Sequence, residues 1–479
     1  MNRPDAMDRA WLERWSTHVG ADESSSALLV DANKVSSIER IPWRLPPSKS
    51  HAIRWLALAA QSDQKVVIHN LAHAGQDILS MRRCLGQFGV RITDLNARGE
   101  VLFSGDDSSL TPPQGTVSWC VEGVGVAGLK LPTSLLDAGN SGTALRILMA
   151  LCARLNGPIT VDGDASLRSR NHDVMAGALE QLGVKVARIE GGGNLPLRIE
   201  GPWNPAGSLT LDISTSSQPT TALCLAAAAL PSSVTLENQG IGVSLRHSEL
   251  TKSLCEQTGA SSSIHQGELH PWTPRIDGSS IVLPPDASML SFAFLAAKVS
   301  QSLVDVEHVP EARDALGHEV LFEFAPSFGL QLKDSTIANV SGGQHAVVDL
   351  RHGNDLITPV AALLALAKGG EIIGAEHAAY KETDRTRGTV ALLKQFGLDA
   401  SFADGRLVVP GGQRLRSPEG QVETYGDHRM QMTALVLAMG CDRDVLIEGA
   451  DLHEVADPEA VQRWQAAGVA IEPLLKRIE

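Results

Sequence analysis

Six segments of the chain begin with a small polar or charged residue and continue into a run rich in Ala and Leu. Their first residues are Ser48, Ser141, Ser217, Ala287, Asp355 and Asp427. Lys49, Arg54 and Arg429 place positive charge within two turns of these starts. An α-helix N-terminus carries unpaired N–H groups and about half a positive charge, so such starts are typical of anion sites. One alone is more often an ordinary cap, but several favour a shared anionic ligand.

Two further groups of polar residues accompany these starts. The second start is glycine-rich and reads Gly-Asn-Ser-Gly-Thr at 139–143, and the third follows Ser-Thr-Ser at 214–216. Elsewhere, Lys-Glu-Thr-Asp-Arg at 381–385 concentrates four charges in five residues. This last segment could be a solvated helix face, or Glu382 could transfer protons with its pKa set by Lys381 and Arg385. The sequence leaves both interpretations open.

The helix starts recur at a nearly constant period. Their spacings are 93, 76, 70, 68 and 72 residues. Glycines that end a second helical stretch stand at Gly89, Gly183, Gly259, Gly329, Gly397 and Gly468, each 41 or 42 residues after its partner. The constant phase predicts six α/β units, each with an apolar helix, a strand, an amphipathic helix ended by Gly, and a strand hairpin.

The units predict an α/β fold of two pseudo-threefold domains. The first helix of each unit is apolar nearly all round, so we expect it inside the domain rather than on its surface. Units of about 70 residues exceed the length of solenoid repeats, which favours three units per domain. Pro46-Pro47 and Pro284-Pro285 suit domain crossings. We predict an extension at 1–26, domain one at 27–46 plus 285–479, and domain two at 47–284.

Composition excludes several classes of protein. The 479 residues carry a formal net charge of −14, which argues against binding to nucleic acid or anionic membranes. No signal peptide or apolar run of about 20 residues is present. The six cysteines are scattered without a Cys-x-x-Cys pair, which indicates reduced and mostly buried thiols. We expect a cytoplasmic protein.

One glycine-rich motif is misleading. Residues 123–128 read Gly-Val-Gly-Val-Ala-Gly and match a dinucleotide-binding pattern. Pro132 follows closely, and no acidic residue stands about 20 positions on in a βαβ setting. We therefore predict a turn here.

Together, the motifs resemble those of the enolpyruvyl transferase family, and within it the shikimate branch. The resemblance runs from about Leu45 to Glu472. Its carriers are 47–50 with Arg54, 139–143 with Arg146, 167–170, 216–218, 286–288, Asp355, 381–385 and 427–430. It implies the inside-out fold of that family, with buried parallel helices and two domains that close on the ligands, and no metal or organic cofactor.

The resemblance also implies a reaction and its residues. In the family, the 5-hydroxyl of shikimate 3-phosphate adds to phosphoenolpyruvate, and the tetrahedral intermediate then loses phosphate. The implied contacts to shikimate 3-phosphate are Lys49, Ser50, Arg54, Ser216, Ser217, Gln218, Ser244, Asp355 and Lys381. Those implied for phosphoenolpyruvate are Lys49, Asn140, Gly142, Arg170, Gln218, Arg385 and Arg429. Lys49, Asp355 and Glu382 would carry the catalytic proton transfers. Cations that face each other across the domains predict an open form without anions.

This chain departs from the family pattern at several positions. Ile53 stands where Asn is frequent, Asn171 replaces a Pro, and His377 and Ala379 replace Asn and Arg. Residues 455–460 lack the Lys and both Phe of a late Lys-x-Phe-Pro-x-Phe motif. These changes spare the anion contacts but alter the surroundings of the ring, so the exact acceptor stays open.

Three other functions were weighed against the first. The sister enzyme, which acts on UDP-N-acetylglucosamine, uses a cysteine acid, and Cys120 lies in about the right region. The motifs at 139–143, 216–218 and 381–385 belong to the shikimate branch, so we predict that Cys120 is buried in a strand. A divergent enzyme with another cyclic or phosphorylated acceptor would explain His377 and Ala379. A non-catalytic binder ranks last because Asp355 and Glu382 are retained. We expect a monomer.

Overall fold

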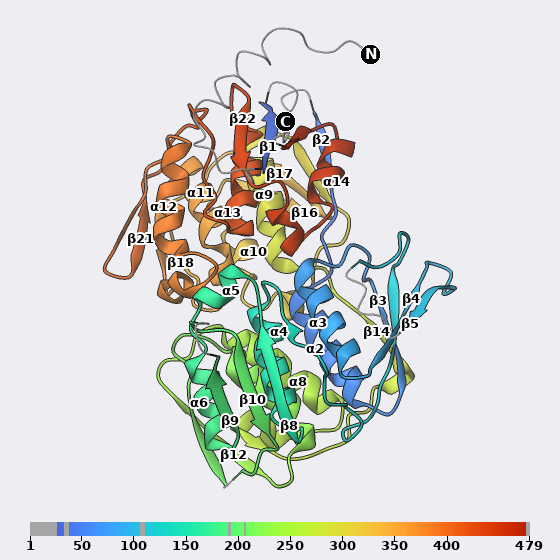
Figure 1. The fold of residues 1–479 in the computed structure, drawn as a ribbon. Helices are drawn as coiled ribbons and strands as arrows, with labels where there is room; N and C mark the ends of the chain where they lie inside the picture. The colour runs from blue at the N-terminus through green and yellow to red at the C-terminus, as the bar shows by residue number, and fades with distance from the viewer. Residues whose placement is uncertain (1–25, 33–37, 106–110, 190–192, 206, 476–479) are drawn as a thin grey trace.

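Two hydrophobic cores divide the chain. The computed structural model describes residues 26–32, 38–105, 111–189, 193–205 and 207–475. One core is built from 52–283, and the other from 28–45 together with 289–471. Figure 1 shows the two lobes one above the other, with the N-terminal strands in the lobe that holds the C-terminal helices. The predicted extension lies outside the described residues, except for Ser26.

The chain passes between the lobes twice at one place. Pro47 and Pro285 form an antiparallel β-bridge, so the two crossings run side by side. We propose domain boundaries near 46 and 285 on this basis. Domain one and domain two below follow this division.

Six sheets form among the described residues, one for each predicted unit. In the second, third and fifth units a strand precedes the buried helix and pairs in parallel with the strand that follows the helix. The first and fourth units exchange these strands at the crossing: the strand at 280–282 pairs in parallel with that at 65–69, and the strand at 40–43 with that at 303–306. The sequence analysis missed this leading strand. Four of the units also have an antiparallel strand pair after their second helix.

Domain two holds three of these sheets. The first orders β14 (Ser280–Val282), β3 (Lys65–His69), β6 (Ser118–Glu122), β4 (Arg91–Leu95) and β5 (Val101–Gly105). The second orders β7 (Leu136–Asp137), β8 (Gly157–Asp162), β10 (Leu197–Gly201) and β9 (Lys185–Arg188), and the third β11 (Ser208–Asp212), β12 (Val234–Gln239) and β13 (Glu268–Leu269). Its helices are α2 (Lys49–Gln61), α3 (Gln76–Gln87), α4 (Gly142–Cys152), α5 (Ala165–Ser169), α6 (Asp173–Gln181), α7 (Gln218–Ala226) and α8 (Leu245–Gln257).

Domain one holds the other three. The fourth sheet orders β16 (Leu330–Lys333), β17 (Thr336–Asn339), β15 (Leu303–Val306) and β2 (Arg40–Trp43), and the fifth β18 (Ala346–Asp349), β19 (Gly370–Ile373), β21 (Arg406–Val409) and β20 (Ser401–Ala403). In the sixth, β1 (Ser26–Asp31) lies between β22 (Val445–Glu448) and β23 (Ala470–Leu475). The helices are α9 (Leu290–Ser300), α10 (Val320–Phe324), α11 (Ile357–Leu366), α12 (Arg385–Gln395), α13 (His428–Ala438) and α14 (Ala460–Ala466).

The first helix of each unit is inside, as predicted. Helices α2, α4 and α7 contact one another, and so do α9, α11 and α13. Every residue of α13 is buried. Because each of these triplets forms the centre of one core, the helix starts of a domain are brought together by packing alone. The predicted pseudo-threefold, inside-out α/β fold is confirmed.

The six glycines end the second helices as predicted. All six have a positive φ, between 69° and 104°. At the first, the N–H of Gly89 donates to the carbonyl of Gly86 (2.9 Å), and the N–H of Val90 donates to Leu85 (3.1 Å). The same pair of bonds recurs at the other five glycines. This is the Schellman ending, in which glycine adopts the left-handed conformation without strain.

Some local predictions were wrong. The third unit has no strand hairpin after Gly259, where a short 3₁₀ helix, η3 (Ser262–Gln266), precedes the two residues of β13. Cys120 lies in β6 as predicted, but it is only half-buried, because it faces away from the buried Trp119 and Val121. Residues 123–128 form a turn after β6, in agreement with the prediction.

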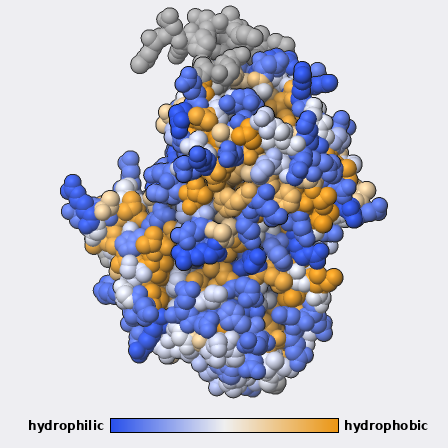
Figure 2. Space-filling view, turned by 180° about the vertical axis from the view of Figure 1, so that it is seen from behind, coloured by the Kyte–Doolittle hydropathy of each residue, from blue (hydrophilic) through white to orange (hydrophobic). Residues whose placement is uncertain are grey.

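The face of the molecule seen in Figure 2 contains small apolar groups rather than one large patch. Seen from behind (Figure 2), hydrophilic side chains cover most of the molecule, with apolar side chains in small groups around its middle. Among the described helices, none has the length and apolar character needed to cross a membrane.

Candidate active site

Arg385 connects three carboxylates in domain one. Its Nε lies 2.7 Å from Asp427 Oδ2, its Nη1 2.8 Å from Asp355 Oδ1, and its Nη2 2.5 Å from Glu382 Oε2. Arg385 is only 1% exposed. Asp427 also caps α13, where it accepts from the N–H of Arg429 at 2.8 Å. The arginine therefore brings the fifth and sixth helix starts and the 381–385 segment to one point.

Both predicted proton-transfer carboxylates are held ionised. Burial raises the pKa of Asp355, but Arg429, Lys381 and Arg385 outweigh it and hold that pKa well below its usual range. Burial also raises the pKa of Glu382, but Arg385 and Arg170 outweigh burial and hold that pKa well below its usual range. A carboxylate with such a pKa accepts a proton in its resting state rather than donating one. Both carboxylates are thus available as proton acceptors, although the same cations weaken their basicity.

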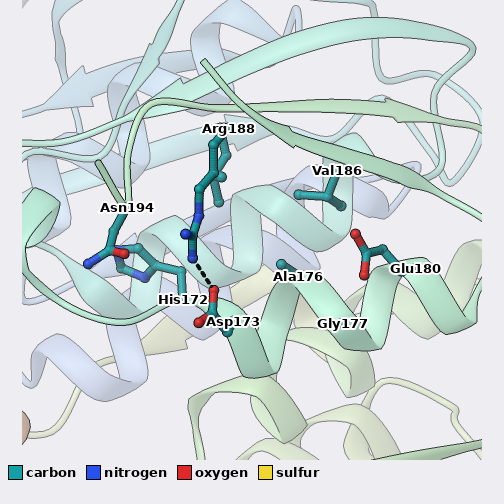
Figure 3. Close-up of a pocket in the computed structure, with 9 residues that line it drawn as sticks. His172, Asp173, Ala176, Gly177, Glu180, Val186, Arg188 and Asn194 are labelled. Carbon is teal, nitrogen blue, oxygen red and sulfur yellow. Dashed lines mark hydrogen bonds and ion pairs between the residues drawn. The ribbon is translucent and has the colours of Figure 1, made fainter. Parts of the chain in front are cut away.

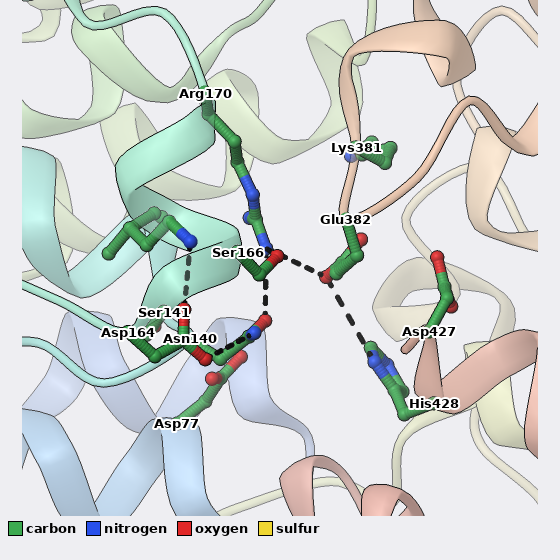
Figure 4. A network of polar contacts seen from close by, with 12 residues as sticks. Asp77, Asn140, Ser141, Asp164, Ser166, Arg170, Lys381, Glu382, Asp427 and His428 are labelled. Carbon is green, nitrogen blue, oxygen red and sulfur yellow. Dashed lines mark hydrogen bonds and ion pairs between the residues drawn. The ribbon is translucent and has the colours of Figure 1, made fainter. Parts of the chain in front are cut away.

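Domain two presents its cations differently. Arg170 donates from Nη2 to Asn140 Oδ1 (3.0 Å) and to Ser166 Oγ (2.9 Å), both neutral groups. The same atom lies 3.6 Å from Glu382 Oε1 of domain one. Figure 4 shows Arg170 reaching from one domain toward Glu382 and His428 of the other. Deeper in domain two, Arg146 Nη1 donates to Gln218 Oε1 (2.7 Å) and to the carbonyl of Gly142 (3.0 Å), which joins the second and third helix starts.

Lys49 has a carboxylate partner that the sequence analysis missed. Its Nζ lies 2.8 Å from Oδ2 of Asp77, which is 4% exposed in the first turn of α3. Burial lowers the pKa of Lys49, but Asp77 outweighs it, so the pKa is raised. The backbone N–H of Lys49 also donates to Asp286 of domain one (3.2 Å). No spacing rule pairs residue 49 with residue 77, because they meet only once α2 packs on α3.

Two of the cavities between the domains are lined by predicted site residues, and they differ greatly in size. The larger, about 670 Å³, is lined from domain two by Arg146, Arg170, Ser216 and Gln218, and from domain one by His377, Lys381 and Glu382, among others. The smaller, about 20 Å³, is lined by Lys49, Ser50, Asp355 and Arg429 together with Ser48 and Asp286. A space of that size holds about one water molecule. The predicted site residues are therefore divided between the two cavities, and neither cavity is lined by all of them.

Three predicted acceptor contacts line neither cavity in the described part of the chain. Arg54 is 2% exposed and donates to Thr251 Oγ1 (2.8 Å), Thr221 Oγ1 (3.1 Å) and the carbonyls of Ser50 (2.7 Å) and His247 (3.1 Å). It thus joins α2, α7 and α8. Ser217 is buried at the start of α7. Ser244 has a φ of 52° before α8, and its N–H donates to Arg351 of domain one (2.9 Å).

The family model for EPSP synthase (3-phosphoshikimate 1-carboxyvinyltransferase) matches residues 40–464. The chain belongs to this family. Three curated relatives, all named 3-phosphoshikimate 1-carboxyvinyltransferase, span bacteria and archaea. The protein of a Bradyrhizobium strain is 28% identical over 89% of this chain and 94% of its own, that of a Synechococcus strain 29% over 87% and 94%, and that of Korarchaeum cryptofilum 28% over 89% and 96%. The solved EPSP synthase of Acinetobacter baumannii, 21% identical, superposes with a TM-score of 0.69 over 94% of this chain and 100% of its own, which establishes the shared fold.

The departures from the EPSP synthase pattern fall in different places. Ile53 is fully buried in the core of domain two, so its side chain does not alter either cavity. His377 and Ala379 line the larger cavity, as does Asn171, whose carbonyl accepts from Arg146 (3.2 Å). Burial, with Lys381 nearby, lowers the pKa of His377 to about 3, so its ring is neutral. In the lining of the larger cavity, the chain thus departs from the family pattern at Asn171, His377 and Ala379.

Residues 455–460 lie where domain one touches the start of α3. A Cβ on Gly75 would lie only 2.6 Å from the carbonyl oxygen of Val455, so no larger residue fits there without movement. His73 Nδ1 lies 2.5 Å from Glu459 Oε1. This segment therefore contributes a contact between the domains.

A third cavity adjoins the larger one. It has a volume of about 340 Å³ and shares His172, Asp173 and Asn194 with the larger cavity. Figure 3 shows it above Ala176 and Gly177 of α6, with Asp173 paired to Arg188 at 2.5 Å. None of the predicted site residues lines it, so it carries no part of the site described here. No group of three His, Cys, Asp or Glu side chains in the described ranges could hold a metal ion.

Proposed function

We propose that this protein transfers the enolpyruvyl group of phosphoenolpyruvate to the 5-hydroxyl of shikimate 3-phosphate and releases phosphate, a step of the shikimate pathway. One observation carries the proposal: Arg385 holds Asp355 and Glu382 together, beside Arg429 and Lys381, directly opposite Arg170 of the other domain. Two anionic substrates need several cations, and proton transfer needs bases at the same point. The names of the relatives agree with this assignment.

Unpartnered buried donors support a phosphoenolpyruvate site. Nε of Arg170, and Nε and Nη1 of Arg429, are buried and have no hydrogen-bond partner among the described residues. Buried guanidinium groups rarely stay unpaired, so these atoms are suited to the carboxylate and phosphate of a ligand. We assign Lys49, Asn140, Gly142, Gln218 and Arg385 to the same substrate.

The larger cavity would take the acceptor. Ser216, Gln218 and Lys381 line it from both domains, where a hydroxyl, an amide and an ammonium group can hold a phosphate. Burial lowers the pKa of Lys381 despite Asp355 nearby. Ser217, Ser244 and Arg54 would act from behind this lining, and Ser50 from the smaller cavity. Asp355 would contact the ring from the smaller cavity.

The proposed reaction has two stages. In the addition, the acceptor oxygen bonds to C2 of phosphoenolpyruvate, its proton passes to a carboxylate, and C3 gains a proton. In the elimination, C3 loses a proton, the double bond reforms, and the C2–phosphate bond breaks. Because Asp355 and Glu382 are held ionised, they serve as the bases, and Lys49 is the group with a proton to give in the addition. Arg385 and Arg429 would stabilise the charge on the departing phosphate.

A second acceptor is favoured by one observation. His377 and Ala379 replace family residues in the lining of the larger cavity, so another cyclic or phosphorylated alcohol is the alternative substrate. The test is phosphate release from phosphoenolpyruvate with shikimate 3-phosphate, compared with shikimate and with UDP-N-acetylglucosamine. We expect phosphate release only when shikimate 3-phosphate is the acceptor. Release only with another phosphorylated cyclic alcohol would establish the alternative.

We also propose that the protein works as a monomer in the cytoplasm. Six free thiols support a reducing compartment, and both walls of the proposed site come from a single chain. Light scattering of the purified protein at its working concentration tests the monomer. A stable dimer would contradict it.

A further inference from the structure

The start of α2 differs from the starts of α4 and α13, whose first turns are capped by the side chain of the residue before the helix. Ser48 has the extended conformation of an N-cap residue (φ −61°, ψ 110°), but its hydroxyl bonds to no amide of the first turn. Ser141 accepts from the N–H of Ala144 at α4, and Asp427 accepts from Arg429 and Met430 at α13. Asp286 of domain one accepts from the N–H of Lys49 (3.2 Å), and the amides of Ser50 and His51 have no side-chain cap among the described residues.

His51 holds the hydroxyl that would form this cap. Ser48 Oγ lies 2.9 Å from His51 Nδ1, and His51 Nε2 lies 3.5 Å from Asp314 Oδ1 of domain one. In the tautomer with its proton on Nε2, the ring turns an N–H toward the Asp314 carboxylate and accepts the Ser48 proton at Nδ1. Burial and Arg54 lower the pKa of His51 to about 4, against a smaller opposite effect of Asp286, so the ring is neutral. The chain Ser48, His51, Asp314 thus crosses from one domain to the other.

The place of this chain connects it to the substrates. Ser48 and Asp314 line the small cavity together with Lys49, Asp355 and Arg429. His51 and Asp314 also line a groove of about 1460 Å³ beside the domain crossing at Pro284 and Pro285. His51 is nevertheless only 4% exposed. The pair forms the wall between the small cavity and this groove.

We infer that His51 and Asp314 are positioning residues for phosphoenolpyruvate binding. In the closed form, Asp314 fixes the His51 ring, and the ring keeps the Ser48 hydroxyl away from the amides of Ser50 and His51. Those amides are then free for the anion that Lys49 and Arg429 also contact. When the domains separate, His51 loses Asp314, and Ser48 can cap α2 in place of the anion. This inference rests on the proposed function, since phosphoenolpyruvate is the anion concerned.

The test compares three variants by calorimetric titration with phosphoenolpyruvate. His51→Leu keeps a side chain of similar size without an acceptor, so Ser48 caps the helix and the Kd rises about 3- to 30-fold, the range of one N-cap hydrogen bond. His51→Asn keeps an acceptor near the Nδ1 position and restores affinity. Adding Ser48→Ala to His51→Leu removes the competing cap and also restores it. If the double variant binds as weakly as His51→Leu, His51 acts through packing only and the inference is wrong.

A matched control comes from the same groove. Arg246 Nη2 lies 3.3 Å from Glu319 Oε1, which also joins the two domains but does not border the small cavity. Glu319→Gln should leave the Kd unchanged, whereas Asp314→Ala should raise it. Equal effects of the two substitutions would overturn the specific role of Asp314.

Hydrogen exchange separates this inference from the proposed function. The first-turn amides of α2 should exchange more slowly in His51→Leu than in the wild type, and return to the wild-type rate in the double variant. This result needs no turnover, so it decides the cap even if shikimate 3-phosphate is not the acceptor. Unchanged exchange in His51→Leu would contradict the inference, and absence of phosphate release by the wild type would contradict only the proposed function.

Discussion

Arg385 and Arg170 face each other from the two domains, yet their surroundings differ. Arg385 bonds to three carboxylates of its own domain, and Asp427 among them is fully buried. Arg170 bonds to the neutral side chains of Asn140 and Ser166, and the carboxylate nearest to it belongs to the other domain. Arg385 is therefore neutralised within its own domain, while Arg170 depends on the partner domain or on a ligand for a negative partner.

This difference assigns different tasks to the two walls. Charges that are paired within one domain hold their positions before substrate arrives, which suits groups that move protons. Cations whose partners are neutral retain most of their attraction for an incoming anion. We therefore expect chemistry to depend mainly on domain one and anion capture to involve domain two.

The largest effect should come from the domain one carboxylates. Asp355→Asn and Glu382→Gln keep size but remove basicity, and general base catalysis is worth about 10²–10⁴ in rate. We expect kcat to fall by that range while phosphoenolpyruvate still binds. Measurement of kcat and Tm on both variants separates a role in proton transfer from a role in stability. A near-normal kcat would show that the substituted residue takes no part in the mechanism.

The free energies of unfolding of two alanine variants test directly whether Arg385 and Arg170 differ in their surroundings. Arg385→Ala leaves the fully buried Asp427 unpaired, and loss of one partner of a buried pair costs about 3–5 kcal/mol. Arg170→Ala leaves two half-buried neutral groups that water can reach, so the cost should be within about 1 kcal/mol. Urea unfolding of both gives the two values. Similar losses would show that the two walls do not differ in this way.

Local rules made the repeat predictable from sequence. Gly89 and its five counterparts each end a helix through bonds among neighbouring residues, so the signal is complete within a few positions. The leading strands were missed because some are very short, such as the two residues of β7, and their pairing partner lies across a helix. Asp77 was missed for a related reason, since its partner Lys49 is on another helix. The site is thus predictable where a motif holds both partners, as in 381–385.

Kinetics should separate the two substrates. Arg170→Ala and Arg429→Ala are expected to raise the KM of phosphoenolpyruvate about 10- to 100-fold, since each loses charged hydrogen bonds. Ser216→Ala and Lys381→Ala should instead raise the KM of shikimate 3-phosphate. Initial rates with each substrate varied in turn give both constants. An Arg429→Ala variant that affects shikimate 3-phosphate alone would reverse the assignment.

The smallest expected effect concerns the overall shape. The sequence predicts an open form because cations of the two domains repel each other. The structure shows contacts that oppose this repulsion: Arg170 lies 3.6 Å from Glu382, and His73 lies 2.5 Å from Glu459. We therefore expect both substrates together to reduce the radius of gyration only slightly. Glu459→Gln weakens the contact with His73, which lies outside both cavities. Without ligands this variant should therefore be more open than the wild type, and the substrates should reduce its radius of gyration by more.

Small-angle scattering with and without both ligands measures this change in each protein. The wild type supplies the reference, and Glu319→Gln, which weakens the interdomain contact with Arg246, shows whether any interdomain pair has the same effect. A radius that is the same with and without ligands in all three proteins would mean that anions do not drive closure. In that case, contacts between the domains, such as that of Arg170 with Glu382, already hold the free protein closed.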